Sequence, residues 1–167
     1  MDNQVFFYVD GIPTKGLWID MDLIDSWDEI KAELVEGKFC SEDYDGDILV
    51  ADAEGLCEPF LSRHDCFDLD EFIDCRDHKT HAPDEAKVAY VNWIGSWSSD
   101  HFDDAYYGDF SGESDPKEAF VYEYVDEAGL LDGVPENLRY YFDYKAFSRD
   151  LFINDFHEED GYIFLNC

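Results

Sequence analysis

Three cysteines and three histidines between positions 57 and 81 are the first residues whose types suggest chemistry. Zinc sites in proteins are built from thiolates and imidazoles, and Cys75-Arg-Asp-His78-Lys-Thr-His81 brings three such groups together in the sequence. The chain contains no Cys-x-x-Cys pair, however, and the spacing of Cys75 and His78 is also that of neighbours on one helical turn. The pattern favours buried thiols and surface histidines, so we predict no metal site and no cofactor.

A second candidate is Asp43-Tyr-Asp45-Gly-Asp47, whose alternating carboxylates look like a calcium-binding loop. The glycine stands at the fourth position, whereas the sharp turn of such a loop needs it at the sixth, so an acidic turn is the better interpretation. No Ser-His-Asp arrangement, Gly-x-Ser-x-Gly motif or glycine-rich phosphate loop stands out. We therefore predict that the protein is not an enzyme.

The dominant chemical feature is an excess of carboxylates. The chain has 42 Asp and Glu against 11 Lys and Arg, a net charge of −31. Residues 1–60 carry −13, residues 61–110 carry −8 and residues 111–167 carry −10, so the charge does not come from an acidic tail. The charge argues against direct binding to nucleic acid or an anionic membrane, because both require cationic surface. With no signal segment and no membrane-length apolar run, we expect a cytoplasmic protein.

Stretches without lysine or arginine recur at residues 42–58, 100–115, 118–136 and 150–167. Self-repulsion on this scale opposes folding, and three explanations remain open: adaptation to high salt, cation binding, or an anionic surface that is itself the function. Aspartate outnumbers glutamate 27 to 15 and lysine is scarce, which fits salt adaptation. Against it, 14 Phe, 11 Tyr and 4 Trp predict a strongly cohesive aromatic core.

The elements that must position these residues change along the chain. Residues 1–60 predict a ββαβ lobe, with strands at 4–9, 16–20 and 47–51 and a helix that Asp25 caps, ending at Gly37. Residues 61–110 predict a mainly helical lobe, with helices at 69–76, 83–93 and 101–107. Residues 111–167 predict an α+β lobe, with helices at 116–128, 136–141 and 144–152 and a strand at 161–165. The fold class expected is therefore α+β.

One segment of the last lobe carries a family resemblance. From Gly129 to Leu151 the chain is similar, without gaps, to the signature segment of the ArdA antirestriction proteins: Gly-Leu-Leu, then Pro-Glu-x-Leu-Arg-x-Tyr-hydrophobic-Asp-Tyr-x-Ala-aromatic-x-Arg-Asp-Leu. Residues 16–20, 51–55 and 102–109 resemble other family segments more loosely. The cysteine and histidine segment from 57 to 81 matches no pattern of the family.

The resemblance implies a DNA mimic encoded by a mobile element. It would be an elongated chain of three small lobes and a homodimer. It would occupy the DNA groove of type I restriction-modification enzymes, formed by the specificity and methyltransferase core. Restriction would be blocked, and whether modification is blocked too stays open. The alternatives are an acidic mimic directed at another DNA-binding protein, and a salt-adapted protein of unrelated function.

Carboxylates can replace phosphates because the arginine and lysine side chains of a DNA-binding groove accept either anion. The candidate phosphate mimics lie in and beside the base-free stretches: Asp100, Asp103, Asp104, Asp109, Glu113, Asp115, Glu118, Glu123, Asp126 and Glu127. The signature segment is less acidic and rich in aromatics, which is typical of a lobe core or a dimer contact. Its packing candidates are Tyr140, Tyr141, Phe142, Tyr144 and Phe147, with Arg139 and Arg149 paired to Asp143 or Asp150.

Overall fold

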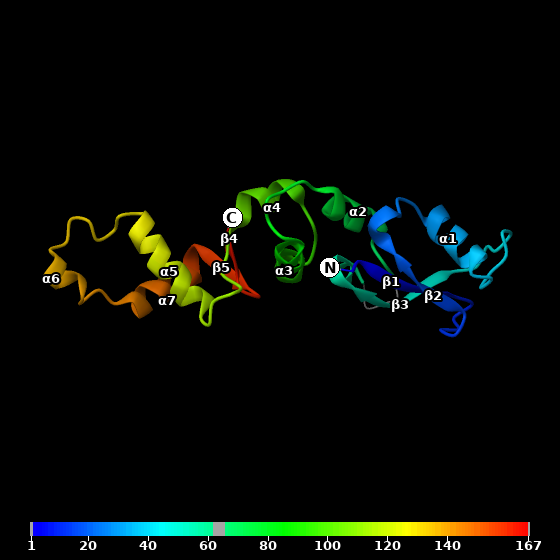
Figure 1. Cartoon of the computed structure of the whole chain (residues 1–167), viewed down its shortest axis with the longest axis horizontal. Coiled ribbons are helices and arrows are strands. Elements are labelled where there is room, and N and C mark those ends of the chain that lie inside the picture. Colours follow the sequence, from blue (N-terminus) through cyan, green and yellow to red (C-terminus); the bar gives the residue numbers. More distant parts are fainter. Residues whose placement is uncertain (1, 62–65, 167) are drawn as a thin grey trace. The chain divides into compact units, whose positions relative to one another are not determined.

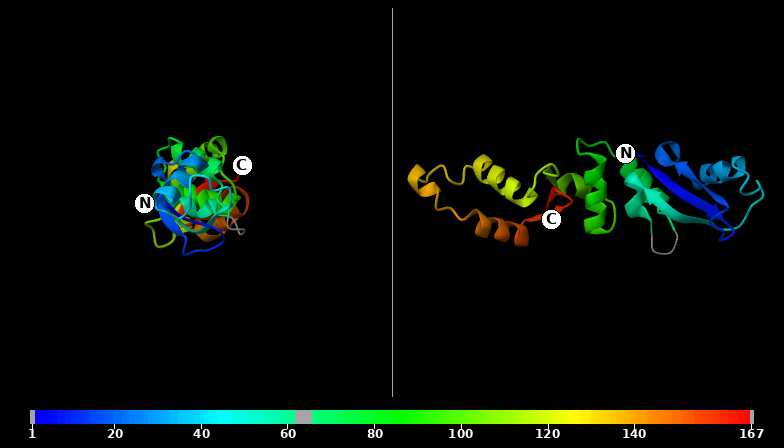
Figure 2. Two further views of the ribbon diagram at one scale, coloured as in Figure 1. Left: turned by 90° about the vertical axis from the view of Figure 1, so that its right-hand side faces the viewer. Right: turned by 60° about the horizontal axis from the view of Figure 1, so that its bottom comes forward.

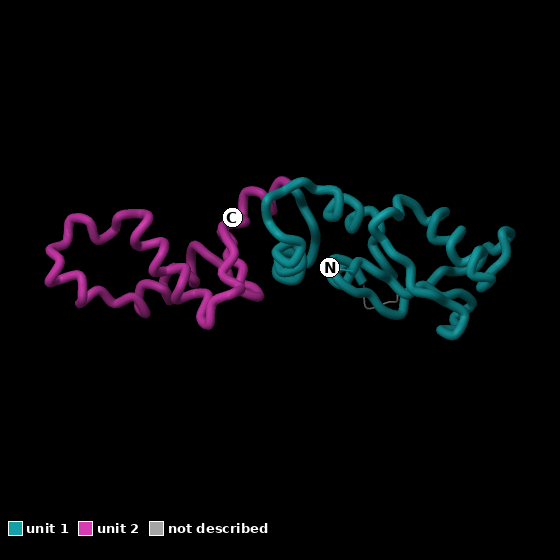
Figure 3. The backbone as a smooth tube through the Cα atoms, viewed as in Figure 1, with its two compact units in different colours: residues 1–99 teal, residues 100–167 magenta. Residues whose placement is uncertain are grey.

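The computed structural model describes residues 2–61 and 66–166, and its contacts divide the chain into two compact units (Figure 3). Unit 1 comprises residues 1–99 and unit 2 residues 100–167. Each unit combines helices with a three-stranded antiparallel sheet, which confirms the predicted α+β class. The division into three lobes stays a prediction, and its expected boundary at residue 110 lies inside unit 2. Within the described residues, no helix is long and apolar enough to cross a membrane.

The sheet of unit 1 has the order β2-β1-β3, with β1 at Gln4–Val9, β2 at Gly16–Asp20 and β3 at Ile48–Glu54. Asp10 and Gly11 both have positive φ, 59° and 66°, and form the tight turn that follows β1. Strand alternation buries Val5, Phe7 and Val9 completely. Helix α1 (Trp27–Glu36) lies on this buried face, where the rings of Phe7 and Trp27 meet edge to face at 5.9 Å.

Helices α1 and α2 (Leu69–Asp77) begin at polar caps, whereas α3 (Asp84–Ile94) follows Pro83 and has no side-chain cap; the cap of α1 was assigned to the wrong residue. Ser26 rather than Asp25 caps α1, because the Ser26 hydroxyl accepts a hydrogen bond from the Glu29 amide at 3.3 Å. Asp68 caps α2 as expected. The remaining helical elements of this part are η1 (Met21–Leu23) and η2 (Gly55–Phe60), and α4 (Ser99–Ala105) begins at the unit's last residue.

The sheet of unit 2 has the order β4-β6-β5, with β4 at Tyr106–Asp109, β5 at Phe156–Glu159 and β6 at Tyr162–Leu165. The predicted helix at 101–107 is wrong at its end, because Tyr106 leaves α4 and pairs with Phe164 in β6. Strand β5 was not predicted at all. It is joined to β6 by Asp160 and Gly161, whose φ values of 51° and 86° suit a tight hairpin turn.

Helices α5 (Pro116–Glu127) and α7 (Tyr144–Asn154) of unit 2 lie side by side, and the chain passes between them through the short α6 (Glu136–Arg139) (Figures 1 and 2). The fully buried Phe120 is the centre of their core, with its ring 4.7 Å from that of Phe156 and 5.5 Å from that of Phe152. In the signature segment, Phe142, Tyr144 and Phe147 are half-buried against this core. Tyr140 and Tyr141 are 89% and 78% exposed.

Candidate functional site

The first candidate carboxylates are placed by the short helix α4. Its inward side chains, Phe102 and Ala105, are fully buried. Because a helix turns by about 100° per residue, burying these two positions directs Asp100, Asp103 and Asp104 towards solvent, and all three are exposed. The core of unit 2 therefore fixes the backbone that presents these charges.

The next carboxylates lie in the turn between β4 and α5 and are oriented by local hydrogen bonds. One Asp109 carboxylate oxygen accepts from the amide and the hydroxyl of Ser111, at 2.9 and 2.6 Å. Asp115 caps α5, since its carboxylate accepts from the Glu118 amide at 3.0 Å. Glu113, between them, is exposed. These aspartates stabilise the turn and the helix while remaining on the surface.

Helix α5 presents the remaining candidates opposite its buried face. Phe120, Val121 and Val125 face the core with at most 3% exposure, whereas the outer positions Glu118, Glu123, Asp126 and Glu127 are exposed. Burial raises the pKa of Tyr107, and the negative charges of Glu127 and Glu123 raise it further. The outer carboxylates of α5 are thus close enough to β4 for their charges to act on the same group.

The same division between core and surface holds throughout the described chain. Every acidic residue there is exposed, except four that are half-buried: Glu71, Asp84, Glu158 and Glu159. No buried polar side-chain atom in the described residues lacks a hydrogen-bond partner. The cores are therefore aromatic and aliphatic, and the negative charge lies on the outside.

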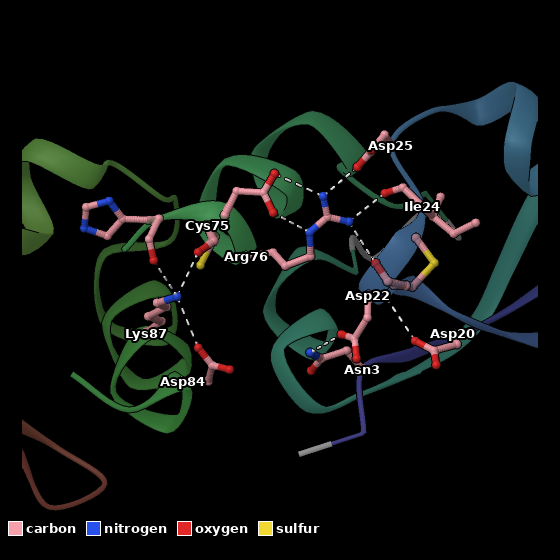
Figure 4. A network of polar contacts seen from close by, with 12 residues as sticks. Asn3, Asp20, Asp22, Ile24, Asp25, Cys75, Arg76, Asp84 and Lys87 are labelled. Atoms are coloured by element: carbon pink, nitrogen blue, oxygen red, sulfur yellow. Dashed lines mark hydrogen bonds and ion pairs between the residues drawn. The ribbon is translucent and has the colours of Figure 1, made fainter. Parts of the chain in front are cut away.

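Two of the few basic residues are used inside unit 1 rather than on its surface (Figure 4). The Arg76 guanidinium donates to the carbonyls of Met21 and Ile24 at 3.0 and 2.8 Å, and it pairs with Asp25 at 2.6 Å and Asp77 at 2.7 Å. The hydrogen bonds to the carboxylates, first that to Asp77 and then that to Asp25, raise the pKa of Arg76. The network ties α2 to η1.

Lys87 forms the second internal basic site and is 3% exposed. Its ammonium donates to the carbonyls of Cys75 and His78, at 3.0 and 3.2 Å, and pairs with Asp84 at 3.1 Å. Lys87 therefore satisfies carbonyls at the end of α2, where a positive charge also suits the helix dipole. Its cationic group neutralises little of the acidic surface.

The expected pairing of the signature arginines is correct for one of them. Arg149 pairs with Asp150 at 2.9 Å. Arg139 does not pair with a carboxylate as predicted: it donates instead to the carbonyls of Val134 and Asp132, at 3.0 and 3.4 Å. Asp143 is occupied differently, because it caps α7 by accepting from the Ala146 amide at 3.0 Å.

A comparison of the chain with models of protein families assigns it to one family. A family model described as antirestriction protein (ArdA) matches residues 7–164. The chain belongs to the ArdA antirestriction family. The match spans both units and includes every candidate carboxylate and every packing aromatic of the signature segment. Antirestriction is accordingly the function of this ArdA chain, while a comparison with curated proteins found no match.

Where the structure describes it, the cysteine and histidine segment of this ArdA chain forms no metal centre. In the described residues, no three His, Cys, Asp or Glu side chains are gathered to hold a metal ion, and His64 lies outside those residues. Cys75 is fully buried, and burial raises the pKa of its thiol to about 12. Cys66 is exposed, contrary to the expected burial, and the half-buried His78 ring lies 5.6 Å from that of Trp97.

Sequence reasoning also missed the structural arginine and lysine of unit 1. A basic residue in the last turn of the predicted helix at 69–76 was a weak signal for Arg76, because cations favour helix C-termini. Its contacts with Met21 and Ile24 lie more than 50 residues away in the sequence, and no local pattern predicts them. No local pattern predicts the partners of Lys87 either, because these carbonyls lie on another helix and in the loop after it.

Proposed function

We propose that this ArdA chain is a non-enzymatic DNA mimic that inhibits type I restriction-modification enzymes. It would occupy the DNA groove of their specificity and methyltransferase core and so block restriction. The observation that carries the proposal is the exposure of all ten candidate carboxylates along residues 100–127, on a backbone held by the buried aromatic core of unit 2. Between residues 100 and 115 no lysine or arginine interrupts them.

The physical basis is that a groove built for phosphates also attracts carboxylates. Arginine forks and lysine ammonium groups bind either anion through charge-assisted hydrogen bonds. Duplex DNA carries one charge per ~1.7 Å of its axis, so a net charge of −31 equals that of about 50 Å of duplex, or roughly 15 base pairs. Much of the attraction is long-range, so association would be fast and would weaken as salt is added.

We further propose that the protein is encoded by a mobile element and acts as a homodimer in the cytoplasm of the host cell. Two chains would double the length of duplex that the negative charge matches. The exposed Tyr140 and Tyr141 support a contact with a second chain, because large aromatic side chains are enriched in protein interfaces. The dimer itself stays a prediction that sedimentation can test.

The test is cleavage of unmodified DNA by a purified type I enzyme, with and without the protein. We expect inhibition at a stoichiometric ratio, relieved by added salt and by excess DNA. Polyaspartate of similar net charge is the control, because it offers the charge without the fold and should inhibit far less. Undiminished cleavage at excess protein would refute the proposal. Methylation by the same enzyme, measured in parallel, shows whether modification is blocked as well.

A further inference from the structure

Strand β2 forms an edge of the unit 1 sheet, and its backbone pairing follows from the bonds just beyond its ends. The Met21 amide donates to the Asn3 carbonyl at 2.8 Å, and the Val9 amide donates to the Lys15 carbonyl at 3.2 Å. The register between β1 and β2 is regular, and hydrogen-bonded pairs of an antiparallel ladder alternate with pairs whose backbone groups point apart. The odd-numbered residues of β2 therefore bond to β1. Three even-numbered residues direct their amide and carbonyl groups to the free edge: Gly16, Trp18 and Asp20.

The other edge strands of the two described sheets carry features that discourage further pairing. The pairing of β3 with β1 shifts register, and β3 exposes Asp52 and Glu54. The pairing of β4 with β6 also shifts register, and β5 carries Glu158 and Glu159. Bulges and charged side chains are the usual means by which proteins protect sheet edges. The centre of β2, Leu17-Trp18-Ile19, has neither, so it is the unprotected edge.

A hollow of about 420 Å³ beside this edge gives an added strand room for its side chains. It lies between β2, η1 and α1, and Ile19, Ile24 and Ala32 contribute apolar surface to it. Hollows that hold ligands commonly have volumes of about 300–1,000 Å³. Leu23, which also lines it, is 87% exposed, and Arg76 donates to the carbonyl of the neighbouring Ile24 at 2.8 Å (Figure 4). This wall is exposed but held in place, so covering it costs little conformational entropy.

The two faces of the sheet specify the side chains that an added strand would carry. Ile19 pairs with the fully buried Val5 on the face that α1 covers, so a side chain added there would enter the apolar hollow. Trp18 lies on the opposite face, 40% exposed, with its ring edge to face with that of Phe6 at 5.6 Å. Side chains of a strand alternate between the faces. The partner should therefore have aliphatic residues at every second position, with the intervening side chains beside the indole.

We infer that β2 accepts an extended segment of the target enzyme as an antiparallel fourth strand of this sheet. Main-chain hydrogen bonds would give the affinity, and the hollow would select the side chains. The strand of five residues needs a segment of about 17 Å, at ~3.4 Å per residue. A second copy of β2 is disfavoured, because pairing would bring together Asp20, Glu29 and Glu33 of both chains around one groove. The inference rests on the proposed function for the identity of the partner, whereas the free edge does not.

The first measurement uses an uncharged peptide and no restriction enzyme. Capped Thr-Val-Thr-Val-Thr is titrated into isotope-labelled protein at low and high salt. We expect the amide signals of Gly16, Trp18 and Asp20 to shift more than those of Leu17 and Ile19, which already bond to β1. The affinity should change by less than about twofold with salt, because no ion pair contributes. Attraction by the acidic surface alone would give no such pattern. Equal shifts along β2, or no shift at the three even-numbered residues with excess peptide, would overturn the inference.

Two N-methylated analogues of this peptide form a matched pair, because each lacks donors on one edge of the strand only. With the valines in the apolar hollow, the threonine amides face β2 and the valine amides face solvent. Methylating two threonine amides should therefore weaken binding at least about tenfold, and methylating both valine amides by less than about threefold. Equal affinities of the two analogues, or a loss in the valine analogue alone, would overturn the antiparallel pairing.

The second measurement is inhibition of a purified type I enzyme by variants of the edge. Trp18→Val and Trp18→Pro both remove the ring, but only proline removes the amide that faces the free edge, and edge strands accept proline at such positions. Trp18→Pro should inhibit at least about fivefold more weakly than Trp18→Val. Leu23→Ser should weaken inhibition about threefold, whereas Ile12→Ser, which removes an exposed apolar side chain outside the hollow, should not.

Near-UV circular dichroism checks that each variant is folded, and the peptide analogues decide the matter if Trp18→Pro is not. If the peptide shifts the three even-numbered amides but the wild type does not inhibit the enzyme, the proposed function fails and the strand-accepting edge stands. If the wild type inhibits, and folded Trp18→Pro inhibits as well as Trp18→Val, pairing with the enzyme at this edge is refuted and the proposed function stands.

Discussion

Replacing Arg76 by methionine should destabilise unit 1 by about 3–5 kcal/mol. The Arg76 side chain is only 11% exposed and donates to two carbonyls, those of Met21 and Ile24, which methionine would leave without this donor. Each lost charge-assisted bond costs about 1.5–3 kcal/mol. Asp25 and Asp77 are exposed and can be hydrated again, so their lost pairs add no more than about 1 kcal/mol each. The guanidinium also lies over the Phe72 ring, 5.8 Å from its centre, and methionine can replace this contact by a sulfur–aromatic one, which limits the loss.

The assay is urea unfolding followed by circular dichroism, with Arg149→Met as the control. Arg149 also pairs with a neighbouring aspartate, but its side chain is 67% exposed, so its replacement should change the free energy of unfolding by no more than about 1 kcal/mol. If Arg76→Met also costs less than about 1 kcal/mol, the reasoning that Arg76 fixes η1 is wrong.

The wild type and Arg76→Met can also be compared as a function of pH. The hydrogen bond from Arg76 is the largest of the effects that hold the pKa of Asp77 below its ordinary value of 3.8. A carboxyl group whose pKa is lower in the folded than in the unfolded protein stabilises the fold at pH values above its unfolded-state pKa. This contribution is lost as the pH falls through its folded-state pKa. The stability difference between wild type and Arg76→Met should therefore be constant from neutral pH to about pH 4 and shrink below it. A difference that grows in acid would contradict this assignment.

Three further predictions concern the surface, the signature segment and the thiols. Asp104→Asn alone should weaken inhibition by less than about twofold, because many weak contacts share the binding energy. Neutralising four carboxylates together should weaken inhibition strongly and flatten its salt dependence; the four are Asp100, Asp103, Asp104 and Asp109. Phe147→Ala should lower the melting temperature, because this ring packs on the core of unit 2, while Tyr141→Ala should leave it unchanged and shift the sedimentation coefficient towards monomer. Ellman's reagent at pH 8 should react with the exposed Cys66 in the folded protein and with Cys75 only after unfolding, since burial raises the pKa of the Cys75 thiol to about 12.

Local signals in the sequence predicted most helices of both units. Asp68, Asp115 and Asp143 each precede a helix and cap it, because side-chain capping depends only on residues three positions apart. The helix expected at 101–107 failed at Tyr106, where pairing with β6, more than 50 residues away, outweighs the local preference. The hairpin signal of Asp160-Gly161 was present, and the strand before it could have been predicted from it.

The candidate carboxylates were selected from the sequence by a local rule, the absence of neighbouring bases, and the structure places them all on the surface. The exposed position of Leu23 could not be predicted in this way. Leu23 is apolar and stands beside buried Met21 and Ile24, so its type alone suggests burial. Its exposure follows from the position of Arg76 in another element, which local spacing does not encode.

The aspartates that cap helices suggest how such a protein can evolve. Asp115 and Asp143 cap helices as well as adding charge. Replacing either by alanine would therefore remove a negative charge and also lower the free energy of unfolding by about 0.5–2 kcal/mol through loss of the cap. An outer carboxylate such as Glu123 caps nothing, and its loss removes one weak contact among many. Lineages can therefore exchange outer carboxylates one at a time while the capping positions stay constant. Divergent members of such a lineage would share few surface residues and still produce a similar negative electrostatic field.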